Sequence, residues 1–564
     1  MRRKILSTFV LCVVAVGIVW AAGTDEGSGT TTEGSIVNVS GYPIVKEPVT
    51  LKGVARMGGY NVPFEDMELL QDYEKETGIS VDWTSIPGSD WTEKMNLLLA
   101  TAEYPDFVYG PLPGNIAELG AEGIIRPLND YISEWAPNLA KLFADQPIVE
   151  AISTYPDGNV YSFPQYDDRV YHTQIPRKML INHSWLEKLG LDLPTTTDEF
   201  YEVLKAFKTE DPNGNGKNDE IPLAFWTGND GNIRDWTMFL GPWGVVDTLM
   251  VADGKVYWGF LEEGFKEGSK FYQKLYKEGL LDLESITQTQ NQVKSKSVNS
   301  DGEAVIGVTY SLATWFVVNN NDWTLMFNGG FNTFKTKEEL TRNPSFIYDA
   351  MLPLEGPGGD RLFRRQMSGV GRNRAFIFSE SKYPEAIVRW FDTWLDGAER
   401  SYQTRLGKLG VTIYVDDGII MRNATPEGVS VNEWQSQYAP GSVSTYYINQ
   451  KIMPMAVQPV VYMLEIMTDK YMPFAPEEFW PGNLVIGTPE EEELITQYEA
   501  ELMTYVYETL GRFIAGDVDI DSEWDGFVRQ SGRMQADKIL QVRQDQYDRY
   551  LNSLPSQHTQ QRRY

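Results

Sequence analysis

The sequence has almost no cysteine and very little histidine. Cys12 is the single cysteine among 564 residues, and it lies within an N-terminal apolar run, so the rest of the chain contains no thiol. Disulfide bonds and thiol catalysis are therefore excluded from that part of the protein. The three histidines, His172, His183 and His558, form no H-E-x-x-H pattern, so the sequence gives no sign of a catalytic zinc site.

Basic side chains are also scarce relative to acidic ones. The chain has 49 lysines and arginines against 79 aspartates and glutamates, which gives a formal net charge of −30. A protein that binds nucleic acid needs a positive surface that neutralises phosphates. We therefore expect no nucleic-acid partner.

Residues 1–22 are predicted to be a secretory signal peptide. Arg2, Arg3 and Lys4 precede an apolar run over 5–19 and then the small residues 21–23, which is the order of such a signal. We expect cleavage after position 21 or 22 and a periplasmic or extracellular location. The alternative is a retained membrane anchor, because the run approaches the length of a spanning helix. Cys12 lies inside the run rather than at its end, so we expect no lipoprotein.

The rest of the chain is long enough for two domains, because single cores stop growing at about 250–300 residues. Residues 23–43 are rich in Gly, Ser, Thr and acidic side chains, which predicts a flexible tether. The folded part is expected to begin near Ile44. Its first elements alternate between strands and helices: a strand at 51–56, a helix ending at Gly78, a strand at 79–83, a helix at 91–102 and a strand at 107–109. This order predicts an α/β fold with a mostly parallel sheet covered by helices.

Later segments repeat the pattern. Thr196 and Glu199 have the spacing of a capping box at the start of another helix. The last quarter of the chain is predicted to be helical, with an amphipathic face that includes Leu502 and Val506 and a helix end at Gly516.

The residues 211–220 read D-P-N-G-N-G-K-N-D-E, which indicates a calcium loop. Oxygen-bearing residues at alternate positions around a glycine at position 6 suit a hard cation that needs many oxygen ligands. Position 12 is Pro222, so the usual glutamate is missing and Glu220 has to replace it. The alternative is a solvated Asn/Gly turn without a metal. The predicted ligands are Asp211, Asn213, Asn215, the carbonyl of Lys217, Asp219 and Glu220.

Aromatic residues are plentiful, with 16 tryptophans and 30 tyrosines. Sugar rings stack on aromatic planes, so carbohydrate is the expected ligand class, although core packing is the simpler explanation for any single ring. Positions just after strands are favoured, because open α/β sheets bind ligands at the carboxyl ends of their strands. A local group of arginines would suit an anionic sugar or would pair with nearby acidic residues; its members are Arg364, Arg365, Arg372 and Arg374. The candidate ligand-binding residues are Tyr60, Asn61, Tyr109, Trp226, Trp243, Trp315, Arg372 and Trp434.

Several segments together resemble the extracellular solute-binding proteins of ABC importers, the family that includes maltose-binding protein. They are most similar to its large alginate- and oligosaccharide-binding subgroup. The resembling segments are residues 73–81, 91–95, 104–106, 157–164, 181–190, 194–200, 211–222, 301–307, 353–357 and 383–390.

The resemblance implies a type II binding-protein fold, with two α/β lobes joined by a hinge and a ligand cleft between them. It also implies that the chain crosses between the lobes more than once, and we expect an N-terminal lobe of 44–172 plus 349–400 and a C-terminal lobe of 173–348 plus 401–564. It further implies hinge closure on an oligosaccharide, delivery to a membrane permease, a structural calcium and no enzymatic activity. We expect a monomer.

Two other functions stay open at this point. One is a secreted carbohydrate-active enzyme, although the folded part has no G-x-S-x-G segment and no phosphate loop. The other is a binding protein for a peptide or another small solute, because one fold hosts many ligands.

Overall fold

The computed structural model describes residues 35–228, 233–312, 334–340, 348–427 and 429–554. The predicted signal peptide and Trp315 therefore lie outside the described residues. Val37–Tyr564 form one compact unit, and the description below is of that unit. Val37 is buried and pairs with Val45, so the packed structure begins earlier than the predicted end of the tether at residue 43.

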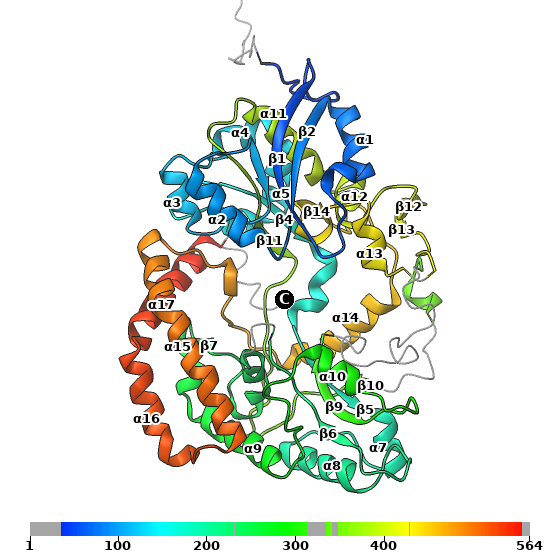
Figure 1. Ribbon diagram of the computed structural model, residues 1–564, viewed down its shortest axis with the longest axis vertical. Coiled ribbons are helices and arrows are strands. Elements are labelled where there is room, and N and C mark those ends of the chain that lie inside the picture. Colours follow the sequence, from blue (N-terminus) through cyan, green and yellow to red (C-terminus); the bar gives the residue numbers. More distant parts are fainter. Residues whose placement is uncertain (1–34, 229–232, 313–333, 341–347, 428, 555–564) are drawn as a thin grey trace, which may run out of the picture. The chain divides into compact units, whose positions relative to one another are not determined.

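The first sheet has the strand order β14-β4-β11-β3-β1-β2 and lies in the upper part of Figure 1. β1, β2 and β3 run parallel, β4 and β14 run parallel, and β11 is antiparallel to its neighbours β3 and β4. The carboxyl ends of β1, β3, β4 and β14 and the amino end of β11 therefore meet at one edge. The strands are β1 (Val49–Met57), β2 (Ile79–Pro87), β3 (Phe107–Tyr109), β4 (Phe163–Asp167), β11 (Val370–Ile377) and β14 (Tyr446–Ile448).

Helices cover this sheet because their apolar residues recur on one face. Leu69, Leu70 and Tyr73 of α1 are buried, and the helix ends at Gly78, whose φ of 75° suits a residue without a Cβ. The rings of Tyr73 and Phe107 pack against Trp390 in α11. The helices of this region are α1 (Glu68–Thr77), α2 (Trp91–Thr101), α3 (Ile116–Ala121), α4 (Asn129–Trp135), α5 (Pro137–Asp145), α6 (Pro147–Ser153), α11 (Pro384–Asp392) and α12 (Glu399–Leu406).

Asp392, at the end of α11, is a buried carboxylate that caps α5. It accepts hydrogen bonds from the backbone N–H groups of Leu139 at 2.8 Å and Asn138 at 3.3 Å. Burial outweighs these hydrogen bonds and raises the pKa of Asp392 to about 7. The native state therefore keeps a proton that the unfolded chain releases as the pH rises from about 4 to 7.

We expect Asp392→Asn to be more stabilising at pH 8 than at pH 5. Between these values the native wild type loses stability as its unfolded state binds fewer protons, whereas the neutral amide does not titrate. Urea unfolding of both proteins at pH 5, 6, 7 and 8 measures the difference. Asp537→Asn, which changes an exposed carboxylate, gives the background. A difference that stays constant with pH would contradict the prediction.

The second sheet has the strand order β10-β5-β9-β6 and lies in the lower part of Figure 1. β6 and β9 are parallel, and β5 is antiparallel to both of its neighbours. The Thr196 and Glu199 capping box at the start of α8 is confirmed. The elements are β5 (Lys178–Asn182), β6 (Ile221–Leu223), β9 (Ile306–Ser311), β10 (Tyr348–Ala350), α7 (His183–Leu189), α8 (Thr197–Thr209), α9 (Glu263–Lys277) and α10 (Gln290–Lys296). Two hairpins, β7 (Leu249–Ala252) with β8 (Lys255–Trp258) and β12 (Ile413–Asp416) with β13 (Ile419–Arg422), stand outside the two main sheets.

The C-terminal helices complete the core of the second sheet. Leu502 and Val506 on the predicted face are fully buried, and α15 ends at Gly516 as expected. Across the described residues, no helix has both the length and the apolar character needed to cross a membrane. These helices are α15 (Pro489–Ala515), α16 (Ile520–Arg533) and α17 (Ala536–Ser553), preceded by α13 (Val431–Ser436) and α14 (Pro459–Tyr471).

The two sheets have separate hydrophobic cores, which makes the protein two-lobed. The predicted α/β class is confirmed. The chain passes between the sheets after β4, after β10 and after β14. β14 pairs with β4, although the sequence assigned all of 401–564 to the second lobe. The reason is physical: the apolar run Tyr446–Ile448 predicts a buried strand, but nothing in it specifies which sheet it joins.

Candidate functional site

Four of the predicted ligand-binding residues lie at the edge of the first sheet where its parallel strands end. Tyr60 and Asn61 follow β1, Tyr109 ends β3, and Arg372 lies near the amino end of the antiparallel β11. Tyr60 is 60% exposed, so its ring is available to a ligand. Tyr60, Asn61 and Tyr109 therefore lie at one edge of the sheet, as their positions after strands predict, and Arg372, predicted from its arginine group, lies at the same edge.

Asn61 supports the loop after β1. Its Oδ1 accepts the Gly58 N–H at 2.6 Å, and its Nδ2 donates to the carbonyls of Ser436 and Ala439, both at 3.0 Å. The amide thus ties this loop to α13, the helix that contains the half-buried Trp434. Asn61 consequently holds the edge in shape, and its hydrogen-bonding groups are already used.

Two of the predicted aromatic residues, Tyr109 and Trp226, lie in the core, and a third, Trp243, packs against it. Tyr109 is 1% exposed and packs on Phe391 and Trp394. Trp226 is 3% exposed, and the half-buried Trp243 packs against the second core. Core packing, the alternative considered from the sequence, explains the burial of all three, because apolar rings contribute most when they are removed from water.

Trp226 follows β6 at the carboxyl edge of the second sheet. Its ring stacks on Tyr310 with 3.7 Å between ring centroids and an interplanar angle of 3°. Its carbonyl accepts the Tyr310 hydroxyl at 2.8 Å and the Trp236 indole N–H at 2.9 Å. This segment is therefore fixed by both stacking and hydrogen bonds.

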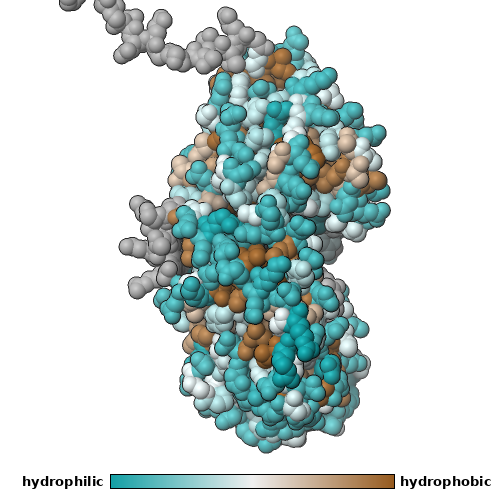
Figure 2. Space-filling model, turned by 90° about the vertical axis from the view of Figure 1, so that its left-hand side faces the viewer, coloured by the Kyte–Doolittle hydropathy of each residue, from teal (hydrophilic) through white to brown (hydrophobic). Residues whose placement is uncertain are grey.

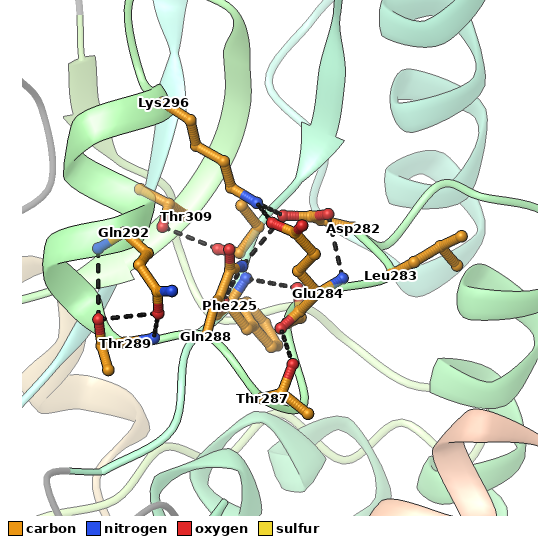
Figure 3. A network of polar contacts seen from close by, with 12 residues as sticks. Phe225, Asp282, Leu283, Glu284, Thr287, Gln288, Thr289, Gln292, Lys296 and Thr309 are labelled. Atoms are coloured by element: carbon orange, nitrogen blue, oxygen red, sulfur yellow. Dashed lines mark hydrogen bonds and ion pairs between the residues drawn. The ribbon is translucent and has the colours of Figure 1, made fainter.

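A buried glutamine holds the same segment from the other side (Figure 3). Gln288 Nε2 donates to the Phe225 carbonyl at 2.6 Å and to Asp282 Oδ2 at 3.0 Å, and the Gln288 carbonyl accepts the Thr227 N–H at 2.9 Å. Lys296 forms ion pairs with both Asp282 and Glu284. Residues 225–227, which follow the carboxyl end of β6, are thus held in place by several hydrogen bonds.

Two arginines and an aspartate that sequence reasoning did not bring together lie near Tyr310. Asp235 is 3.0 Å from Arg364 and 3.8 Å from Arg177, and Arg364 is also 3.7 Å from Asp247. Both arginine contacts cross long stretches of sequence, so no local pattern could have revealed them. The predicted arginine group is thereby partly accounted for by acidic partners.

A cavity of about 910 Å³ lies between the first-sheet edge and the C-terminal helices. Arg372 lines it, and the guanidinium donates to the carbonyls of Leu484, Val485 and Ile152 at 3.1, 3.2 and 3.4 Å. Figure 2 faces the side on which α15 and α17 lie, where hydrophobic residues stand among hydrophilic ones. The cavity is lined by both lobes, with Asn115, Tyr155 and Arg372 from one and Trp480, Glu492 and Arg543 from the other.

The predicted calcium loop follows α8 and is shaped by its own side chains. Asp211 accepts the backbone N–H groups of Gly214, Asn215 and Gly216 at 2.9–3.1 Å. Asn213 Oδ1 accepts the Asn215 N–H at 3.1 Å, and Asn215 Oδ1 accepts the Lys217 N–H at 2.7 Å. The loop is therefore wound tightly around its side-chain oxygens.

Asp219 and Glu220 complete the loop. The Nδ2 groups of Asn213 and Asn215 approach Asp219 at 2.9–3.2 Å. Glu220 Oε1 is buried without a hydrogen-bond partner among the described residues. Burial, together with the charges of Asp219 and Asp211, raises the pKa of Glu220. A buried unpartnered carboxylate oxygen beside two other carboxylates fits a cation site.

The carboxylate side chains of this loop would not be enough by themselves to bind a cation. Over the described part of the chain, no three His, Cys, Asp or Glu side chains gather closely enough to hold a metal. A hard cation would thus also need the amide oxygens of Asn213 and Asn215 and the carbonyl of Lys217, which is the ligand mixture expected from the sequence.

Comparisons with known proteins agree with this architecture. The fructooligosaccharide ABC transporter substrate-binding protein FusA of Streptococcus pneumoniae is 28% identical over 572 residues, covering 98% of this chain and 99% of that protein. Its structure with kestose, and that of its EF-hand mutant with fructo-nystose, each match with a TM-score of 0.73 and 27% identity, over 90% of this chain and 100% of that chain.

A third solved structure supports the fold alone. An extracellular solute-binding protein from Bifidobacterium longum subsp. infantis matches with a TM-score of 0.78 at 20% identity, covering 89% of this chain and 98% of that chain. The sequence profile of a family described as bacterial extracellular solute-binding protein matches residues 63–399. This match covers more than half of the sequence, and the chain accordingly belongs to the bacterial extracellular solute-binding protein family.

Proposed function

We propose that the protein is the substrate-binding component of an ABC importer and that it captures an oligosaccharide outside the cytoplasmic membrane. The observation that carries this proposal is the similarity to FusA over nearly the full length of both chains. The proposal is also supported by the division into two lobes, each with its own sheet, and by a large cavity that residues of both lobes line.

The proposed mechanism is closure of two lobes around the solute. We assign the described residues within 37–167 and 370–448 to one lobe and those within 178–350 and 459–553 to the other, following the sheets that their strands join. The three connecting segments would act as the hinge. A ligand that contacts both lobes stabilises the closed form by its differential affinity, and the closed monomer would then deliver it unchanged to a membrane permease.

The test is binding without turnover. Titration calorimetry of the exported form with kestose, other neutral oligosaccharides and a peptide panel should give heat only with sugars. Chromatography of the recovered sugar should show no cleavage. Peptide binding, or a shortened sugar, would reject the proposal in favour of another solute or an enzyme.

Tyr60 is the predicted ligand-binding residue that the structure leaves most exposed. We expect Tyr60→Ala to weaken sugar binding about tenfold, because stacking of an aromatic ring is lost, at about 1–2 kcal/mol. The melting temperature should not change, since the ring buries little surface. Tyr414→Ala removes another exposed tyrosine, on β12, and should leave affinity unaltered. Equal affinities for both variants and wild type would remove Tyr60 from the site.

We also propose a structural calcium ion held by Asp211, Asn213, Asn215, the Lys217 carbonyl, Asp219 and Glu220. The EF-hand mutant of FusA is consistent with a similar loop in that relative. When bound, the ion would neutralise three neighbouring carboxylates and fix the end of α8. The chain's own contribution is a loop wound by hydrogen bonds from its backbone N–H groups to Asp211, Asn213 and Asn215.

Export of the chain is implied by its family, and we propose cleavage of the signal after position 21 or 22 without lipid attachment. Cys12 lies inside the apolar run and would leave with the signal. Mass spectrometry of the secreted protein should give an unmodified N-terminus at Ala22 or Gly23.

A further inference from the structure

A second cavity, of about 310 Å³, lies where the segments between the lobes meet. Arg169 and His172 come from η2 (Asp168–Gln174), which leaves the carboxyl end of β4, and Gln450 follows β14. Gln458, the N-cap residue of α14, and Tyr462 within that helix also line the cavity. The cavity therefore adjoins the same edge of the first sheet as Tyr60 and Arg372.

Cationic side chains dominate its walls. Arg169, Lys337, Arg405 and Arg422 line the cavity, and among the described lining residues Glu465 is the one acidic side chain. Glu465 lies 3.1 Å from Lys337. The cavity thus has a local excess of positive charge in a protein whose net charge is strongly negative.

The partners of the arginines are unequal. Arg169 is held by two contacts to Asp167, with Nε at 2.8 Å from Oδ1 and Nη2 at 2.6 Å from Oδ2. Arg405, by contrast, forms no ion pair within the described residues, and its Nε is buried without a hydrogen-bond partner there. Its guanidinium lies over the ring of Tyr446, 5.9 Å from the centroid.

The charged form of Arg422 is disfavoured by its surroundings. Burial lowers the pKa of Arg422 well below its ordinary value, the charges of Arg169 and Arg405 lower it further, and the charge of Asp167 opposes this shift. Asp167 compensates part of the positive charge of the three guanidinium groups, and an anion in the cavity would compensate the rest, since burying like charges is costly unless they are compensated.

We propose that this cavity binds an oxyanion, namely a carboxylate or sulfate group carried by the bound oligosaccharide. The planar guanidinium groups of Arg405 and Arg422 match the paired oxygens of such a group. Gln450 and Gln458 line the same cavity and carry side-chain amides that would donate to the neighbouring hydroxyls. The volume lies at the lower end of the range for small-molecule pockets, about 300–1,000 Å³, so it suits one charged sugar unit. The sugar-borne source of the anion rests on the proposed function.

The experiment compares an oligogalacturonate, its carboxyl-reduced neutral form, kestose and inorganic sulfate at constant ionic strength. Calorimetry and thermal shift are measured on the exported form and on Arg405→Gln. We expect the acidic sugar to bind at least tenfold more tightly than its neutral form and to lose about tenfold or more with Arg405→Gln. Arg405→Lys keeps the positive charge but loses the planar guanidinium group with its paired donors. Its affinity for the acidic sugar should lie between those of wild type and Arg405→Gln. Arg533→Gln, at an exposed site, is the charge control and should bind like wild type.

The outcomes separate this inference from the proposed function. Sulfate binding that depends on Arg405, without preference for the acidic sugar, would assign the cavity to a free anion and overturn the sugar-borne source. Binding of kestose with no effect of charge or of Arg405 would overturn the oxyanion site and leave the proposed function standing. Anion binding without any sugar binding would leave the oxyanion site standing and overturn the proposed function. Unchanged sulfate and acidic-sugar affinities in a folded Arg405→Gln protein would refute the site directly.

Discussion

Replacing Asp211 by alanine is expected to abolish the rise in melting temperature that the proposed calcium ion would give the wild-type protein. The two carboxylate oxygens of Asp211 accept three backbone N–H groups, so the substitution removes both a proposed ligand and the contacts that wind the loop. A ligand present at a thousand times its dissociation constant stabilises a native protein by about 4 kcal/mol. Loss of the ion should therefore be one of the largest single effects in this chain.

The measurement is a thermal melt of wild type and variant in EGTA, in magnesium and in calcium. Asp192→Ala is a matched control, because it removes an exposed carboxylate outside the loop. Wild type and control should gain stability with calcium and little with magnesium, which prefers fewer protein ligands. A wild type whose melting temperature ignores calcium, or an Asp211→Ala protein that responds fully, would refute the site.

The second large effect is expected at Arg372, which joins β11 to segments far away in sequence. Arg372→Ala would leave the carbonyls of Ile152, Leu484 and Val485 without this donor. Removal of a half-buried arginine that forms three hydrogen bonds costs about 3 kcal/mol. We expect the variant to unfold at clearly lower urea concentration.

Arg372→Lys tests the geometric part of this argument. A lysine keeps the charge, but one ammonium group cannot reach three carbonyls as a guanidinium does, so its stability should fall between wild type and alanine. Sugar affinity is measured beside stability, because Arg372 also lines the larger cavity. An unchanged urea midpoint for Arg372→Ala would show that these contacts contribute nothing to stability.

Local patterns were sufficient where the physics is local. The Thr196 and Glu199 capping box, the strand at Phe107–Tyr109 and the buried face with Leu502 and Val506 all follow from periodicity and spacing along the chain. The residues of the calcium loop are likewise close in sequence, so their mutual contacts could be expected from their spacing.

The proposed binding surface was harder to predict from patterns along the chain. The rule that ligands lie at strand ends placed Tyr60 and Tyr109 at one edge correctly, yet Tyr109 is buried and Tyr60 is exposed. Whether a ring at a strand end faces the core or solvent depends on what packs against it, here Phe391 and Trp394 from a distant helix. No pattern around Tyr109 contains that information.

The sequence by itself indicated that the chain is an α/β protein of the solute-binding family, that it is exported, and that residues 211–220 form a tight loop. Hydrophobic periodicity, caps and short motifs act over a few residues and can be seen in one dimension. The tertiary structure alone decided that β14 joins the first sheet, that Arg177 and Arg364 share Asp235, and that Arg169, Arg405 and Arg422 meet around one cavity. Those arrangements depend on contacts between segments that the chain brings together only when it folds.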